Sequence, residues 1–163
     1  YMYMEEWSQT YPTAKVWATK GLEKIFEGSK VIPSYTILDK TVTMSWQSEI
    51  DYLPFEGSAL IEESVFFHKK SRTLILTDLI ENIELLEHCS CWHRFLFKIG
   101  DNTYPNGHTP RDLRMTFWFN KEIARKCYQK IKSWEPVNVL FAHGKCFIGD
   151  AEEKLPQAFF WLE

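Results

Sequence analysis

Several features are missing or scarce in this sequence of 163 residues. No apolar run approaches the roughly 18 to 20 residues that span a bilayer. No basic stretch followed by an apolar run marks a signal peptide. Acidic residues outnumber basic ones, 22 to 19, and give a net charge of −3. A general nucleic-acid binder needs a concentrated basic face. We therefore expect neither a membrane nor a nucleic-acid partner.

Cysteine is also scarce, and the motifs of common enzyme classes are missing. The four cysteines are Cys89, Cys91, Cys127 and Cys146, and the chain has enough core residues to fold without disulfides. With no N-x-[ST] site either, we expect a cytoplasmic or other reducing intracellular location. No Walker loop, G-x-G-x-x-G or G-x-S-x-G is present, so nucleotide binding and serine hydrolysis by those routes have no support.

What the sequence has is apolar and aromatic bulk. Apolar residues make up 45% of the chain and aromatic residues 16%, which predicts a substantial core in one domain over residues 1–163. The chain starts at Tyr1, inside an apolar stripe with helical spacing and with no N-capping residue before it. We therefore expect that an N-terminal segment of the same protein is missing and acts as a partner.

Strand-length apolar runs alternate with helical patterns, which predicts an α/β protein built in layers. Residues 64–67 and 73–77, joined by a polar turn, indicate a β-hairpin. The runs at 73–77 and 137–142 look buried on both faces. Further strands are expected at 15–18 and 49–53, with another short one within 31–47. Helices are expected over 3–11, 21–26, 79–86, 87–100 and 120–134, and from either Asp150, in a capping box with Glu153, or Pro156.

Asp78 and His143 are the strongest candidates for chemistry. Each directly follows an apolar strand, and functional groups of α/β sheets gather just beyond strand ends. A carboxylate and an imidazole that converge there can bind Zn²⁺ or iron, or form an acid/base pair. Gly144 permits a close backbone turn beside His143. The competing interpretation is that Asp78 only caps a helix that starts at Leu79.

Other candidates favour structural roles. His88, Cys89, Cys91 and His93 are zinc-ligand types, but a C-x-C pair without a second distant pair is atypical of a zinc module. His68 and His108 are interpreted as turn and loop residues.

The segment Pro110–Arg114 contains two arginines three residues apart, with an aspartate between them. Arg111, Asp112 and Arg114 suit an anchor for a loop, or a site for an anionic substrate.

Three segments in this order resemble an uncharacterised family of the metallo-β-lactamase-like superfamily: VFFHKKSRTLILTDLIEN, YPNGHTPRDLRMTF and VLFAHGKCF. The resemblance implies an αββα sandwich, of which this chain would be the C-terminal part. It implies one or two metal ions, zinc or iron, at the sheet edge. By position, Asp78 and His143 match two of the metal ligands.

The resemblance also has gaps. The family's middle histidine should fall near Ser58, and its early histidine motif at or before Tyr1 to Glu6, yet neither place has a histidine. The resemblance therefore implies either a metal-dependent hydrolase with a degenerate site or a non-catalytic protein that keeps the sandwich for binding. In the first case an ester, thioester, amide or phosphodiester of an unknown small molecule is the substrate. An exposed apolar face could also lead to a homo-oligomer.

Overall fold

The computed structural model describes residues 3–19, 34–39, 43–60, 63–85, 90, 92 and 99–163. It divides into two compact units, Tyr1–Thr43 and Met44–Glu163. The first contains α1 (Met4–Thr10) and a parallel pair of strands, β1 (Val16–Ala18) and β2 (Tyr35–Ile37). These elements confirm the expected N-terminal helix and two of the expected short strands. The helix expected over 21–26 lies outside the described residues.

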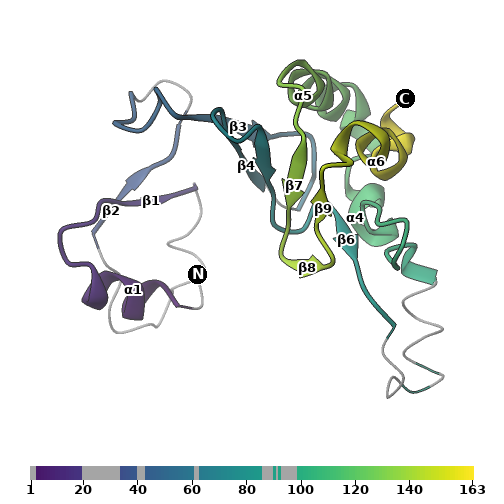
Figure 1. Cartoon of the computed structure of the whole chain (residues 1–163), viewed down its shortest axis with the longest axis horizontal. Coiled ribbons are helices and arrows are strands. Elements are labelled where there is room, and N and C mark those ends of the chain that lie inside the picture. The colour runs from purple at the N-terminus through teal and green to yellow at the C-terminus, as the bar shows by residue number, and fades with distance from the viewer. Residues whose placement is uncertain are drawn as a thin grey trace. The chain divides into compact units, whose positions relative to one another are not determined.

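The second unit is built on a five-stranded sheet with the order β3-β4-β5-β7-β9, which can be followed in Figure 1. Its strands are β3 (Ile50–Phe55), β4 (Glu63–His68), β5 (Thr73–Ile75), β7 (Asn138–Leu140) and β9 (Phe147–Ile148). β5 and β7 are parallel, and the other neighbours are antiparallel. The predicted hairpin is confirmed as β4 and β5. A separate parallel pair is formed by β6 (Glu81–Asn82) and β8 (His143–Gly144).

Helices pack on one face of the five-stranded sheet. They are α4 (Arg111–Thr116), α5 (Lys121–Ser133) and α6 (Ala151–Ala158), with the short 3₁₀ turns η1 (Trp118–Asn120) and η2 (Phe160–Leu162). The core joins buried strand residues such as Val65, Leu74 and Val139 to Tyr128 and Ile131 of α5. The helix predicted over 120–134 is confirmed as α5, and its buried residues recur at helical spacing. Together the sheets and helices confirm the α/β class.

The opposite face of the sheet is apolar and partly bare. Phe66, Ile75 and Leu140 are register partners on three adjacent strands, so their side chains lie in one row. Ile75 and Leu140 are 36% and 40% exposed, respectively. The prediction that residues 73–77 and 137–142 are buried on both faces is therefore wrong. Helices cover the face that carries Leu74 and Val139 and leave this row open.

Two further expectations about helices need correction. Residues 79–85 are not helical: Leu79 and Ile80 are buried, and the next residues pair as β6. Residues 87–98 lie outside the described residues except for Ser90 and Trp92. The last helix starts at Ala151 and contains Pro156, so the first of the two starts is correct. The Asp150 side chain makes no capping hydrogen bond, however, so the expected capping box does not form.

Candidate functional site

Asp78 and His143 meet at the carboxyl ends of β5 and β7. Backbone hydrogen bonds continue beyond the strands, from Leu76 N to Leu140 O at 2.8 Å and from Ala142 N to Thr77 O at 3.1 Å. The two parallel segments therefore leave the sheet side by side. His143 Nε2 lies 3.0 Å from Asp78 Oδ1. The side chains are 53% and 52% exposed, respectively, so the pair is open to solvent.

The exposure of this pair bears on the interpretations left open by the sequence. No helix follows Asp78, because Leu79 and Ile80 enter the core and Glu81 and Asn82 then pair as β6. The interpretation of Asp78 as a helix cap is therefore wrong. The His143 side chain is half exposed, so it is not a hydrogen-bonding residue of the core.

Glu63 holds the backbone from which Asp78 projects. This glutamate is 5% exposed at the start of β4. Its Oε1 accepts a hydrogen bond from Thr77 N, and its Oε2 accepts one from Asp78 N at 3.1 Å. Burial raises the pKa of the Glu63 carboxyl above its ordinary value, and the two backbone N–H groups oppose that rise. Sequence reasoning missed Glu63, because its role depends on where β4 ends relative to β5.

Gly144 and Asn82 hold the backbone next to His143. Gly144 has φ +95°, and a Cβ there would lie 2.0 Å from the Asn82 carbonyl oxygen. Asn82 is buried, and its Nδ2 donates a hydrogen bond to Lys145 O at 2.7 Å. Lys145 N in turn donates to Asn82 O at 3.0 Å. The predicted close turn at Gly144 is thus a contact between backbones that leaves no room for a side chain.

The Asp78–His143 pair combines a carboxylate with an imidazole, which suits proton transfer or metal ligation. Two ligand atoms about 2.1 Å from a tetrahedral zinc ion lie about 3.4 Å apart. The observed 3.0 Å is close to that spacing, so the two residues fit two ligand positions after a small movement. Among the residues that the structure describes, no set of three His, Cys, Asp or Glu side chains converges on one point.

The predicted Arg111–Asp112–Arg114 motif forms the start of α4. The Arg114 side chain is largely buried and pairs with Asp101 Oδ2 at 2.8 Å. Its guanidinium also lies over the Phe160 ring, 5.0 Å from the centroid. Arg111 is exposed, and Asp112 accepts a hydrogen bond from the backbone N–H of Leu113. Arg114 thus anchors the 101–108 loop through Asp101, and the aspartate between the arginines takes no part.

The two other histidines that the structure describes have nearby polar partners. His68 ends β4, and its Nδ1 lies 2.7 Å from Ser71 Oγ across the turn. His108 Nδ1 lies 3.3 Å from Asp101 Oδ1, and its ring packs edge-on to Phe160. Both contacts are structural in character.

The possible zinc ligands around Cys89 and Cys91 cannot be placed in the structure. His88, Cys89, Cys91 and His93 lie outside the described residues. Of the other two cysteines, Cys127 is buried and Cys146 is half-buried.

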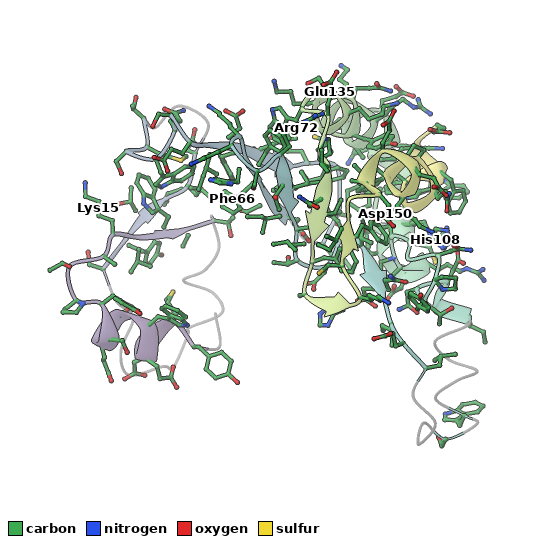
Figure 2. All side chains as sticks on the ribbon, viewed as in Figure 1. Lys15, Phe66, Arg72, His108, Glu135 and Asp150 are labelled. Atoms are coloured by element: carbon green, nitrogen blue, oxygen red, sulfur yellow. The ribbon has the colours of Figure 1, made fainter. Side chains whose placement is uncertain are left out.

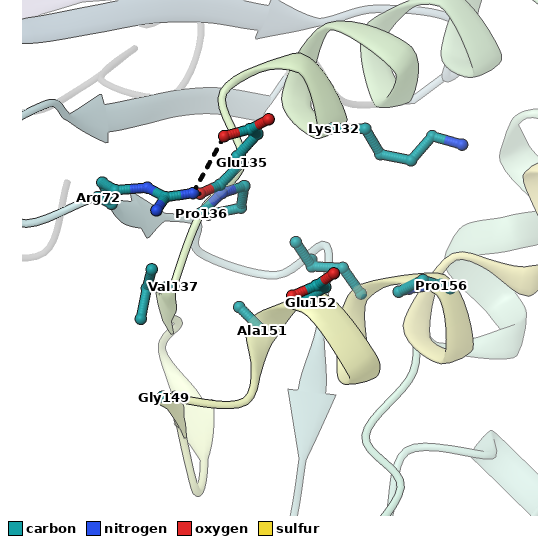
Figure 3. Close-up of a pocket in the computed structure, with 10 residues that line it drawn as sticks. Arg72, Lys132, Glu135, Pro136, Val137, Gly149, Ala151, Glu152 and Pro156 are labelled. Carbon is teal, nitrogen blue, oxygen red and sulfur yellow. Dashed lines mark hydrogen bonds and ion pairs between the residues drawn. The ribbon is translucent and has the colours of Figure 1, made fainter.

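A cleft of about 440 Å³ lies at the opposite, amino ends of β5 and β7. Figure 3 shows Arg72 and Glu135 at its edge, and Gly149 and α6 below them. An Arg72 guanidinium nitrogen contacts both the backbone carbonyl and the carboxylate of Glu135, the latter at 3.3 Å. In Figure 2 this pair lies near α5, away from His108. The Arg72 and Glu135 side chains at this edge of the cleft thus neutralise each other.

No protein-family model matches the chain, and no curated protein or solved structure is significantly similar to it. No described helix is both long enough and apolar enough to traverse a bilayer.

Proposed function

We propose that this chain belongs to a metal-dependent hydrolase in which Asp78 and His143 are two of the metal ligands. The observation that carries the proposal is the 3.0 Å contact between His143 Nε2 and Asp78 Oδ1 at adjacent parallel strand ends. A zinc or iron ion would supply Lewis-acid activation of a water molecule. The chain's own part is to hold the two ligand atoms at the proper spacing.

The fold that we propose is the metallo-β-lactamase-like αββα sandwich. In that architecture each sheet has helices on its outer face and the other sheet on its inner face. The arrangement here supports the proposal, because the helices pack on the face of Leu74 and Val139. The other face presents the row of Phe66, Ile75 and Leu140. A second sheet packed over that row would bury the exposed side chains of Ile75 and Leu140.

The second candidate is a protein that keeps this architecture without a working metal site. One observation favours it: among the described residues only two ligand-type side chains meet at the strand ends. A catalytic zinc site has three protein ligands and an open position. The hydrolase therefore needs one more ligand, from outside the described residues or from a partner.

Metal analysis separates the two candidates. The protein is purified without chelator, and zinc and iron are measured per chain by mass spectrometry. We expect near-stoichiometric metal in the wild type and its loss in Asp78→Asn and His143→Gln. Matched controls are Asp51→Asn, which alters an exposed carboxylate paired with Lys69, and His68→Gln, which alters the histidine at the end of β4. Both should keep the metal.

Two results would contradict the hydrolase. One is the absence of metal from the wild type even after incubation with excess zinc or iron. The other is equal metal content in the site variants and the controls. Either result leaves the non-catalytic candidate as the better explanation.

A further inference from the structure

The helices α4 and α5 meet at a corner that carries exposed apolar side chains. Trp118 and Phe119, in the 3₁₀ turn η1 between them, are 79% and 92% exposed, respectively. Met115 of α4 and Ile123 of α5 are exposed on either side. We call these four residues the aromatic vertex. A phenylalanine this exposed contacts almost nothing of its own fold, so the vertex protrudes.

Cations continue the vertex along both helices. Arg111, Met115 and Trp118 are spaced four and three residues apart, which places them on one side of α4 and η1. Phe119, Ile123 and Lys126 repeat the same spacing along the start of α5. Each line therefore runs from an apolar side chain at the corner to an exposed basic one farther along.

The charge of this region is opposite to that of the rest of the chain. Seven of the 19 basic residues but only two of the 22 acidic ones lie between residues 111 and 133. The segment therefore carries +5, whereas the remainder carries −8. Of its two carboxylates, Asp112 accepts the Leu113 N–H and Glu122 pairs with Arg125. Arg114 pairs with Asp101, and Lys130 and Lys132 lie in the last turn of α5, so the cations that flank the protruding aromatic side chains are Arg111, Lys121 and Lys126.

We propose that the aromatic vertex and its flanking cations dock on the surface of an anionic lipid bilayer. A protruding apolar tip can enter the soft headgroup region, where tryptophan is favoured, whereas a protein partner would need a matching groove. Each nearby lysine or arginine adds attraction to anionic headgroups that decays within a Debye length. The contact is peripheral, so it needs no membrane-spanning run. It differs from the expectation of no membrane partner, which rested on the absence of such a run.

Vesicle co-sedimentation tests the proposal. The full chain is mixed with vesicles of phosphatidylcholine alone or of phosphatidylcholine with phosphatidylserine. We expect binding to the second kind only, and weaker binding as salt rises. The double variant Trp118→Ser/Phe119→Ser and the charge variant Lys121→Glu/Lys126→Glu should each lose at least about tenfold in affinity. Trp7→Ser, which changes an exposed aromatic residue of α1, is the control and should bind as the wild type does.

The altered side chains are at the surface, so the variants should fold, and circular dichroism verifies this. No binding to either vesicle, or equal binding by the wild type and the aromatic variant, would overturn the proposal. Binding that does not depend on phosphatidylserine would also overturn it. If instead the wild type self-associates in sedimentation velocity and the aromatic variant does not, with no vesicle binding, the vertex is a contact between copies. None of these outcomes depends on metal content, so the hydrolase proposal is tested separately.

Discussion

The two ends of the parallel pair β5 and β7 are built differently. At the amino end, Arg72 and Glu135 form an exposed pair in which one arginine group contacts both a backbone carbonyl and a carboxylate. At the carboxyl end, Asp78 and His143 contact each other by single atoms, and the backbone beneath them is held by buried Glu63 and Asn82. At the amino end, an exposed ion pair joins the turn that carries Arg72 to the turn that carries Glu135. The carboxyl end places buried polar groups under two exposed titratable ones.

This difference matters because burying a polar group is costly unless its hydrogen bonds are satisfied. Glu63 is 5% exposed, and its carboxylate accepts hydrogen bonds from Thr77 and from the backbone N–H of Asp78. An exposed ion pair, by contrast, typically contributes about 0–1 kcal/mol. Stability alone does not explain why a buried glutamate supports the backbone of an exposed pair that contributes so little. The comparison therefore favours a functional role for the carboxyl end, and it can be tested by matched substitutions at the two ends.

Glycine gives the largest expected contrast. Gly144→Ala adds a Cβ 2.0 Å from the Asn82 carbonyl oxygen at φ +95°, whereas Gly149→Ala adds one at φ +81° with no atom within 4 Å. We expect Gly144→Ala to lower the free energy of unfolding by about 3 kcal/mol or more, from steric overlap and backbone strain together. Gly149→Ala should cost about 1 kcal/mol from strain alone. Urea unfolding measures both, and equal costs would show that the backbones at the carboxyl end are not tightly packed.

Glutamate gives the next contrast. Glu63→Ala removes a buried side chain and leaves the part-buried N–H groups of Thr77 and Asp78 without their acceptor, so we expect a loss of about 2–3 kcal/mol. Glu135→Ala removes an exposed carboxylate from Arg72 and should cost about 0.5 kcal/mol or less. Urea unfolding at neutral pH compares the two variants. A cost for Glu63→Ala as small as that for Glu135→Ala would remove the argument that Glu63 supports the site.

The same comparison separates what the sequence predicts from what it does not. Asp78 and His143 were predicted because each follows an apolar run, which is a local pattern, and the structure brings them together. The helix α5 was predicted because its buried residues recur every three or four positions. Such features depend on neighbours in the sequence, so one chain is enough to find them.

The failures have a common physical cause in pairing over long separations. Residues 79–85 have an apolar pattern that suits a helix, but Glu81 pairs with both His143 and His108. These partners satisfy the backbone in an extended form, and tertiary pairing then prevails over local propensity. The role of Glu63 also depends on register, since β4 must end where Thr77 and Asp78 leave β5. The exposure of Ile75 and Leu140 depends on whether another layer packs on their face of the sheet, which the sequence of these strands does not reveal.

The pH dependence of stability sharpens the role of Glu63 by a smaller effect. Burial raises the pKa of Glu63 above its ordinary value of 4.5, so the folded protein holds this proton to higher pH than the unfolded chain does. The contribution of Glu63 to stability is therefore fully present below pH 4.5 and declines as pH rises through the folded pKa. Glu63→Gln should lack this decline. Urea unfolding between acidic and neutral pH measures it, with Glu135→Gln as the exposed control. A Glu63→Gln curve parallel to that of the wild type would contradict the prediction.

The smallest expected effect is the coupling between Asp78 and His143. Both side chains are about half exposed, so a double-mutant cycle with Asp78→Asn and His143→Gln should give only about 0.2–1 kcal/mol at neutral pH. A small coupling, beside a large cost for the glutamate beneath the pair, means that the pair itself contributes little to the fold. The buried glutamate then serves to hold Asp78 in position beside His143. A coupling above about 2 kcal/mol would exceed what exposed pairs provide and would make Asp78–His143 a structural pair, like Arg72–Glu135 at the other end.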